Sequence, residues 1–417
     1  MSFQTVSVIG LGYIGLPTAA ILAASGKQVI GVDVNREAVN IINSGAIHIT
    51  EPDLDVLVHS VVKNGALRAT TTPEPADAFM IAVPTPFREN HQPDLAYVKA
   101  AGLSIATVLR KGNLVVLEST SPVGTTELLA EWMAEARPDL SFPHQAGEDA
   151  DVAVAYCPER VLPGQVLKEL VENDRLIGGL TERCTSLATE LYSSFVKGGC
   201  VATDCRTAEM AKLTENSFRD VNIAFANELS LICDQLDIDV WKLIRLANRH
   251  PRVNILNPGP GVGGHCIAVD PWFIVSRSPE QSRMIRTARE VNDYKPEWIL
   301  EKMARRISEF SGREGRPPVV CCYGVAFKPN IDDLRESPAL EITRKLIEAG
   351  TASILVVEPN IRRLPAKLAG ARLVGIEEAS RDADLHVMLV AHREFATLSA
   401  SETTRDAMDF CGLFTLA

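Results

Sequence analysis

A single cysteine stands in a loop made almost entirely of glycine and proline. Cys266 follows the run from Pro258 to Gly264, which holds four glycines and two prolines, and Asp270 comes four residues later. Glycine leaves the backbone bare, so that a ligand can approach it closely, and core packing rarely places a thiol in such a run. The pattern predicts a nucleophilic sulfur beside an acid. A zinc site through His265 and Cys266 is disfavoured, because adjacent residues seldom share a tetrahedral site and no second ligand pair is evident.

The first residues carry a glycine-rich turn between a predicted strand and a predicted helix. Gly10, Gly12 and Gly15 have the G-x-G-x-x-G spacing, and Asp33 ends the next predicted strand. Such a turn brings a pyrophosphate to a helix N-terminus, and an acid at this place bonds a ribose diol and favours NAD over NADP. A glycine turn of another α/β fold is the alternative. A hydride acceptor and a nucleophilic thiol in one chain suggest an oxidation through a thioester.

Hydroxyls and charged groups follow three later predicted strands. Thr85 comes after the first of them, Thr120 and Thr126 after the second, and Glu159 with Arg160 after the third. Ligands of open α/β sheets bind at the carboxyl ends of the strands, so these side chains can hold a cofactor or a water molecule. Turn capping explains each threonine equally well, and a neighbouring acid–base pair is usually a solvated surface feature.

A purely helical pattern runs from about Thr203 to Ala247, with Asp204 as a plausible N-cap. Lys212, Asn216 and Arg219 share one face of this helix. A polar stripe on a helix is more often simply solvent-facing. A helix of this length between two α/β halves suggests packing against its copy in a second subunit, with a buried helix of the single chain as the alternative.

Short apolar strands alternate with helical segments in both halves of the chain, which predicts βαβ units and parallel sheets. Helices are predicted at 17–25, 95–109 and 337–349, and strands at 6–9, 28–32, 79–83, 114–117, 152–156, 319–324, 354–357 and 385–390. A polar segment at 309–318 predicts a linker or a loop. The expected fold is α/β, with two Rossmann-like doubly wound parallel-sheet domains joined by a long central helix. The expected domains are residues 1–200, 201–305 and 306–417.

Charged residues are dense just after the predicted strand at 319–324. Lys328 and Arg335 can meet phosphates, whereas Asp332 and Asp333 can instead form a metal site.

The composition is that of a soluble globular protein. The 417 residues carry 42 basic and 53 acidic side chains, a net charge of −11 that argues against general nucleic-acid binding. We find no signal peptide and no apolar run long enough to span a bilayer. The nine cysteines match no disulfide framework, so a cytoplasmic location is expected.

Taken together, these segments resemble the nucleotide-sugar 6-dehydrogenases, the family of UDP-glucose dehydrogenase. The resemblance covers residue 1 to beyond residue 390 and rests on the glycine turn, residues 211–216, residues 263–266 with Asp270, and residues 327–330. Three stretches resemble the branch of the family that oxidises UDP-N-acetyl-D-mannosamine for bacterial surface polysaccharides, such as the enterobacterial common antigen. They are residues 119–124, 157–164 and 249–254.

The resemblance implies a four-electron oxidation of a C6 alcohol to a carboxylate with two NAD⁺ in turn. Cys266 would form a thiohemiacetal and then a thioester. Lys212 and Asn216 would stabilise the oxygen charge that develops, and Lys212 is also the family's acid–base residue. Asp270 and Glu159 would activate or position water, which Thr120 would help to hold. No metal is implied.

The resemblance also implies the binding residues. For NAD it indicates the glycine turn with Tyr13, Ile14, Asp33, Thr85 and Thr126. For the UDP-sugar it indicates, besides Lys212 and Asn216, the residues Arg160, Val161, Arg219, Gly263, Phe327, Lys328 and Arg335. His250 and Arg252 match residues that reach the neighbouring subunit's substrate, which implies a homodimer with a shared site.

One departure from the family lies in the tail, where Cys411 stands in place of a basic residue that would help to bind substrate. The alternatives are the same chemistry on UDP-glucose or UDP-N-acetylglucosamine, a single-step hydroxyacid dehydrogenase that needs no thiol, and a nucleotide-sugar binding protein without turnover.

Overall fold

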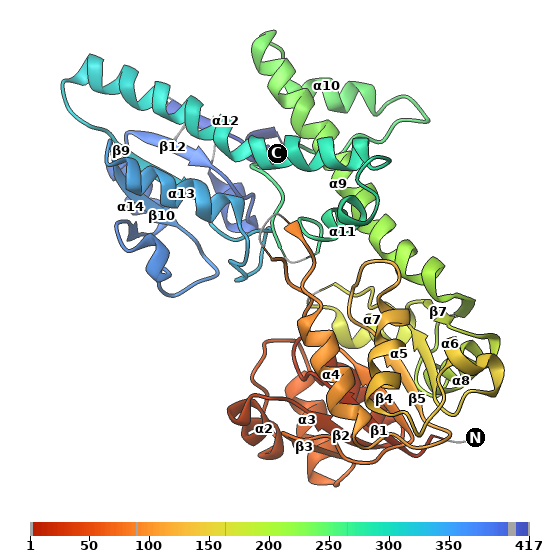
Figure 1. Cartoon of the computed structure of the whole chain (residues 1–417). Helices are drawn as coiled ribbons and strands as arrows, with labels where there is room; N and C mark the ends of the chain where they lie inside the picture. The colour runs from red at the N-terminus through yellow and green to blue at the C-terminus, as the bar shows by residue number, and fades with distance from the viewer. Residues whose placement is uncertain (1–2, 89–90, 163, 265, 399–405, 416–417) are drawn as a thin grey trace. The chain divides into compact units, whose positions relative to one another are not determined.

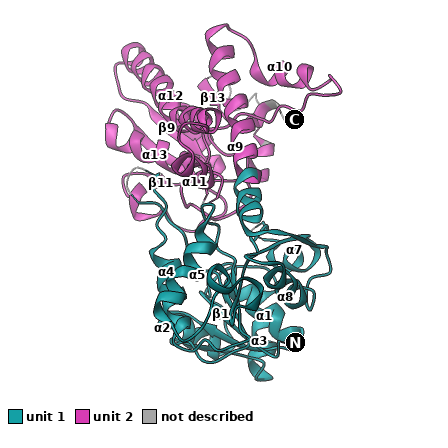
Figure 2. Ribbon diagram, turned by 45° about the vertical axis from the view of Figure 1, so that its right-hand side comes forward, with its two compact units in different colours: residues 1–214 teal, residues 215–417 magenta. Residues whose placement is uncertain are grey.

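The computed structural model describes residues 3–88, 91–162, 164–264, 266–398 and 406–415. His265 therefore lies outside the described residues. The chain divides into two compact units, Met1–Thr214 and Glu215–Ala417 (Figure 2). No helix in the described part of the chain is long and apolar enough to cross a bilayer.

Unit 1 is built on an eight-stranded, mostly parallel sheet with the order β3-β2-β1-β4-β5-β6-β7-β8. The first six strands run parallel, β7 is antiparallel to β6, and β8 is parallel to β7. The strands are β1 (Thr5–Ile9), β2 (Gln28–Val32), β3 (Leu67–Thr70), β4 (Ala78–Ile81), β5 (Leu114–Leu117), β6 (Ala153–Tyr156), β7 (Arg175–Gly179) and β8 (Cys200–Asp204). The order reverses between β1 and β4, which is the crevice where doubly wound sheets bind nucleotides.

Helices cover both faces of this sheet (Figure 1). One apolar cluster packs α1 and α3 against the strands, and a second packs α4 and α5 on the other face. The central strands β4, β5 and β6 are therefore buried on both sides, as expected for a parallel sheet, whereas the edge strand β8 is largely exposed. The helices are α1 (Gly15–Ala24), α2 (Arg36–Asn43), α3 (Leu54–Lys63), α4 (Ala96–Ala106), α5 (Thr125–Ala136), α6 (Pro143–Ala146), α7 (Val166–Glu172) and α8 (Glu182–Tyr192).

The long helix is shorter than the sequence pattern predicts. Helix α9 spans Cys205–Gln235 and carries the chain from unit 1 into unit 2. Its predicted N-cap is confirmed, because the Thr207 N–H donates to Asp204 at 2.9 Å. The prediction of an unbroken helix to residue 247 is wrong. Asp237 takes a positive φ of 54°, and Asp239 then caps a separate helix, α10 (Val240–Ala247), with its side chain.

Unit 2 adds a five-stranded parallel sheet with the order β11-β10-β9-β12-β13. Its strands are β9 (Val319–Tyr323), β10 (Ser353–Val357), β11 (Arg372–Leu373), β12 (Leu385–Met388) and β13 (Ala407–Asp409). Its further helices are α11 (Asp270–Arg277), α12 (Arg283–Glu314), α13 (Pro338–Ala349) and α14 (Ile376–Asp382). The predicted linker at 309–318 is wrong in its first half, because α12 continues to Glu314 and ends at Gly315 with φ 68°. The predicted class, two Rossmann-like parallel-sheet domains, is confirmed.

Candidate active site

The glycine turn joins β1 to α1 and leaves no room for side chains at two of its three positions. A Cβ on Gly10 would lie 2.7 Å from the Ala82 carbonyl oxygen, and one on Gly15 would lie 1.7 Å from the Gly10 carbonyl oxygen. A Cβ on Gly12 would meet open space, and Gly12 and Tyr13 are exposed while Ile14 is half-buried. The turn thus presents bare backbone at the start of α1, which fits the pyrophosphate of a dinucleotide.

Asp33 lies beside this turn at the end of β2. Its carboxylate accepts the N–H of Leu11 at 2.8 Å and the N–H of Asn35 at 2.8 Å. The acid predicted to bond a ribose therefore also holds the glycine turn at residues 10–15 in place. Each amide donates to a different carboxylate oxygen, so each oxygen keeps lone pairs that can accept from the hydroxyls of a ribose diol.

Two of the predicted threonines meet at the ends of neighbouring strands. The Thr85 hydroxyl donates to the Thr120 carbonyl at 2.6 Å. Thr126 is fully buried, and both its N–H and its hydroxyl donate to Glu209, at 2.9 and 2.8 Å. The Thr126 hydroxyl is thus engaged inside the protein at the start of α5, and the predicted contact of this residue with NAD stays a prediction.

Glu159, at the end of β6, is held by an arginine that the sequence pattern did not single out. Arg175 on β7 forms a 2.8 Å ion pair with Glu159, and both residues are buried. The Arg160 N–H donates to the other Glu159 oxygen at 2.6 Å, and Val161 packs against the core of unit 1. The ion pair fixes the direction of a carboxylate that would otherwise be costly to bury.

A second buried acid lies in the same part of unit 1. The Tyr192 hydroxyl donates to Glu118 at 2.5 Å. Burial, and next the charge of Glu159, raise the pKa of Glu118 to about 7. Neither Glu118 nor Arg175 was predicted from the sequence to belong to the site, although Glu118 directly follows the predicted strand at 114–117 and so carries the same strand-end signal as Thr120; Arg175 carries no such signal.

Cys266 and its neighbouring acid, Asp270, are linked through the backbone within unit 2. Cys266 is the only exposed cysteine of the nine, all of which lie in the described part of the chain. Its carbonyl accepts the N–H of Asp270 at 2.8 Å, at the start of α11. The buried Asp270 carboxylate in turn accepts a hydrogen bond from the side-chain amide of Asn216 on α9. Lys212, also buried, is one helical turn earlier on α9, while Arg219 is exposed.

A buried amide and ion-pair network anchors the glycine–proline loop. The Asn227 side chain accepts the Gly259 N–H at 2.9 Å and donates to Asn292 on α12 at 2.8 Å. Asn292 donates to Asp220 at 2.8 Å, and Asp220 pairs with Arg289 at 2.6 Å. The network connects α9, α12 and the loop, and so helps to set where the thiol lies.

The predicted substrate residues Gly263 and Phe327 lie against each other. A Cβ on Gly263 would lie 2.8 Å from the Phe327 Cβ, and Gly264, with φ 80°, lies under the Phe327 ring. Phe327 is half-buried, and Lys328 next to it is exposed. Arg335 is exposed and forms a 2.6 Å ion pair with Asp333, and no group of three metal-binding side chains occurs among the described residues.

His250 and Arg252 are exposed on the turn after α10, where the Arg252 N–H donates to His250 Nδ1 at 3.3 Å.

Cys411 lies in a tight turn after β13. Its N–H and that of Gly412 donate to Asp409, at 3.0 and 2.8 Å. This turn places Gly412 against the Trp241 ring.

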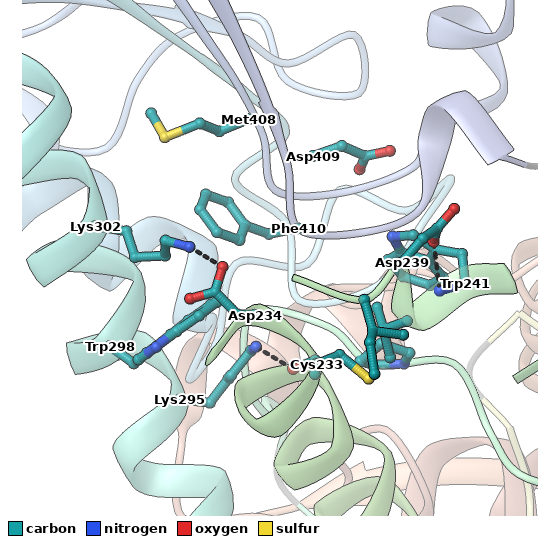
Figure 3. Close-up of a pocket in the computed structure, with 14 residues that line it drawn as sticks. Cys233, Asp234, Asp239, Trp241, Lys295, Trp298, Lys302, Met408, Asp409 and Phe410 are labelled. Carbon is teal, nitrogen blue, oxygen red and sulfur yellow. Dashed lines mark hydrogen bonds and ion pairs between the residues drawn. The ribbon is translucent and has the colours of Figure 1, made fainter. Parts of the chain in front are cut away.

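A cavity of about 290 Å³ opens elsewhere in unit 2, and Figure 3 shows its lining. None of the predicted site residues lines it. The buried Lys295 amine donates to the Ser230 hydroxyl and lies 4.0 Å from the centre of the Trp298 ring, while Lys302 pairs with Asp234. Burial lowers the pKa of Lys295 to about 7.

The β3-β2-β1-β4-β5-β6 order, the bare turn and Asp33 define unit 1 as a dinucleotide-binding fold of the dehydrogenase class. The chain belongs to the UDP-glucose/GDP-mannose dehydrogenase family. The NAD binding domain of that family matches residues 4–196, its central domain matches residues 206–294, and its UDP binding domain matches residues 321–410. The protein is therefore an NAD-dependent nucleotide-sugar dehydrogenase.

Curated relatives match nearly the whole chain. A UDP-N-acetyl-D-mannosamine dehydrogenase of Escherichia coli (strain K12) is 62% identical over 96% of this chain and 96% of its own length. An NDP-N-acetyl-D-galactosaminuronic acid dehydrogenase of Ralstonia nicotianae is 60% identical over 99% of this chain and 97% of its own length. A solved structure of a UDP-D-ManNAc dehydrogenase from Pyrococcus horikoshii shares 37% identity, covers 98% of this chain and 96% of that one, and superposes with a TM-score of 0.86.

Proposed function

We propose that this protein oxidises UDP-N-acetyl-D-mannosamine at C6 to the uronate, as a step toward a bacterial surface polysaccharide. The observation that carries the proposal is the exposed Cys266 beside the Asp270–Asn216 hydrogen bond. The near-full-length identity with enzymes named for this substrate supports the choice of sugar.

The chemistry follows from the residues around the thiol. In the first oxidation the C6 hydroxyl loses a proton and C6 loses a hydride, which leaves an aldehyde. The Cys266 thiolate adds to the aldehyde, and the resulting thiohemiacetal loses a second proton and hydride to become a thioester. Water then releases the uronate and restores the thiol. NAD, when bound, accepts the hydride of each oxidation.

The neighbouring groups have distinct roles in this proposal. Lys212 and Asn216 stabilise the developing oxygen charge, and Lys212 also exchanges protons. Asp270, held by Asn216, and Glu159, held by Arg175, orient the hydrolytic water with Thr120. NAD is held by the glycine turn together with Tyr13, Ile14, Asp33, Thr85 and Thr126. The UDP-sugar is held by Arg160, Val161, Arg219, Gly263, Phe327, Lys328 and Arg335.

We further propose a cytoplasmic homodimer. Each chain would have three domains: a cofactor-binding domain at 1–200, a central domain at 201–305 and a nucleotide-sugar-binding domain at 306–417. Phe218, Phe225 and Ile232 recur every seven residues on α9 and are 70%, 51% and 45% exposed. An exposed apolar stripe of this kind is typical of a helix that packs on its copy. His250 and Arg252 would then complete the partner's substrate site.

Counting NADH per sugar tests the chemistry. Two NADH formed for each UDP-sugar consumed support the thioester route, whereas one would reject it in favour of a single-step dehydrogenase. Binding of both NAD and UDP-sugar with no NADH at any pH would indicate a silent binding protein.

A substrate panel tests the sugar. The 60% identity with the Ralstonia enzyme favours an N-acetylgalactosamine-type substrate as a second candidate. The panel compares kcat/KM for UDP-N-acetylmannosamine with that for UDP-N-acetylgalactosamine, UDP-N-acetylglucosamine and UDP-glucose. A higher value for any of the last three would reject our choice of sugar.

A further inference from the structure

The loop that carries Phe327 and Lys328 is fastened at both ends to one buried carboxylate–imidazole pair. Glu358 follows β10 and His392 follows β12, and the side chains of both are completely buried. His392 Nε2 and Glu358 Oε2 are 3.0 Å apart. Glu358 follows the predicted strand at 354–357 as Asp33 follows its own, but no role was predicted for it from the sequence, and no pattern marked His392.

Glu358 holds the first end of the loop. The N–H groups of Val325 and Ala326 donate to its Oε2 at 2.8 and 3.1 Å, and the N–H of Asn360 donates to Oε1 at 3.1 Å. Asp33 has the corresponding place after the second strand of unit 1 and receives the Leu11 N–H. Glu358 differs from it in being closed off from solvent, so this acid serves the loop and not a ribose.

His392 holds the other end. The Asn330 N–H donates to His392 Nδ1 at 2.9 Å. Since a backbone N–H can only donate, Nδ1 must be unprotonated, and the ring proton is on Nε2, where it donates to Glu358. Asn330 has a φ of 63°, a left-handed conformation that Asn tolerates better than most residues. Its side-chain oxygen also accepts the Arg393 N–H at 2.9 Å.

We infer that His392 is a positioning residue, which acts through Asn330 and Glu358 to hold the loop at 325–330 in the shape that binds a nucleoside diphosphate. The inference rests on the proposed role of Phe327 and Lys328 in binding UDP. The Lys328 side chain is flexible, so its charge can be placed beside a phosphate only if the backbone of the loop is held in place. Loss of the imidazole leaves the Asn330 N–H and the buried Glu358 each short of one partner.

The Asn360 side-chain amide also bonds His392 Nδ1, at 3.0 Å. Three substitutions of His392 separate the bonds at Nδ1 from the bond between Nε2 and Glu358. The amide oxygen in His392→Asn can replace Nδ1 as the acceptor for Asn330. The amide nitrogen in His392→Gln can replace the donor to Glu358, and His392→Leu replaces neither. His386→Asn is the matched control, because His386 is a buried histidine of the same sheet whose ring bonds the Tyr323 hydroxyl at 3.0 Å.

The readouts are the Kd of UDP and of NAD by calorimetry, the KM and kcat for the UDP-sugar, and amide hydrogen exchange at residues 325, 326 and 330. In His392→Leu we expect UDP binding to weaken by about tenfold or more, which corresponds to the loss of one to two hydrogen bonds. The KM for the sugar should rise, kcat at saturation should change by less than about threefold, and NAD binding should stay within about twofold. The three amides should exchange faster, and the control should match the wild type.

The Asn and Gln variants keep the inference testable if His392→Leu does not fold. His392→Asn should bind UDP more tightly than His392→Gln, because only the former keeps the acceptor for Asn330. Equal or reversed affinities, or a His392→Leu protein with wild-type UDP affinity, would overturn the role of His392. A wild-type protein that binds no UDP would instead refute the proposed function itself.

Discussion

Cys266 differs from the other cysteines of the chain in its surroundings. Burial raises the pKa of Cys157, Cys321 and Cys322, which lie in the packed sheets. A thiol there is a structural apolar group. Cys266 is exposed between the bare glycine loop and α11, so it is the thiol that a substrate can reach.

Replacing Cys266 by Ser should stop net oxidation while NAD binding survives. A hydroxyl is a far weaker nucleophile than a thiolate, so we expect uronate formation to fall by about a thousandfold or more. Steady-state NADH production and NAD titration measure the two effects. Cys200→Ser, at a half-buried position on β8, should behave like the wild type. Normal turnover in Cys266→Ser would remove this residue from the mechanism.

Asp33 should matter to NAD in two ways. Its carboxylate holds the Leu11 N–H of the glycine turn, and it would repel a 2′-phosphate. Asp33→Ala should therefore weaken NAD binding by about tenfold or more and reduce the preference for NAD over NADP. Asp33→Asn keeps one acceptor for Leu11, so it should bind NAD more tightly than the alanine variant while losing the same discrimination. Unchanged cofactor preference in both variants would contradict this role.

At the scale of elements, α9 and α12 are joined by buried polar side chains. The Asp220–Arg289 pair and the Asn227–Asn292 amides lie along one part of the interface between the two helices, and the Lys295 amine lies further along it, beside Ser230 and Trp298 (Figure 3). Polar groups buried in this way restrict how two helices can slide, because a shifted register would leave them unpaired.

Lys295 should make stability depend on pH. Burial lowers its pKa from 10.5 to about 7, so the folded state binds this proton less well than the unfolded chain. The cost of burying the amine grows as pH falls from about 10.5 to 7 and is constant below that range. Lys295→Met should thus raise the free energy of unfolding by roughly 2–4 kcal/mol at pH 7 and by much less at pH 10. Removal of the Ser230 hydrogen bond reduces this gain at both pH values, whereas loss of the cation–π interaction with Trp298 reduces it only at pH 7, where part of the amine is charged.

Urea denaturation followed by tryptophan fluorescence at both pH values measures this difference. Lys242→Met, at an exposed position on α10, is the control and should show no pH-dependent gain. A gain in Lys295→Met that is equal at pH 7 and pH 10 would contradict a lowered pKa.

At the scale of the whole molecule, the exposed stripe on α9 should decide the assembly. Phe225→Glu places a charge in the middle of that stripe, where a partner helix would have to bury it. We expect the variant to sediment as a monomer at concentrations where the wild type is a dimer. Its sugar oxidation should fall as well, because His250 and Arg252 would no longer reach a neighbouring site. Val56→Glu, on α3 of unit 1, is the control. A Phe225→Glu protein that still sediments as a dimer would contradict packing through α9.

Much of the fold followed from short-range patterns. The strand at 28–32 and the helix that begins after Ser337 and ends at Gly350 were predicted to the residue or nearly so. Apolar periodicity and caps are properties of neighbouring residues, so they need no knowledge of the rest of the chain. The break at residues 236–239 was missed, because both flanking segments keep a helical pattern and the left-handed Asp237 lacks the usual glycine signal.

Local spacing was sufficient to indicate a thiol on a bare loop, a dinucleotide turn with its acid, and two parallel-sheet halves. Which side chains hold each other emerged only in three dimensions. Arg175 holds Glu159, and His392 with Glu358 holds the loop of Lys328, although these partners are 16 and 34 residues apart. Such pairs depend on which strands lie side by side, and hydrogen bonds act over about 3 Å, so no pattern of adjacent residues contains them.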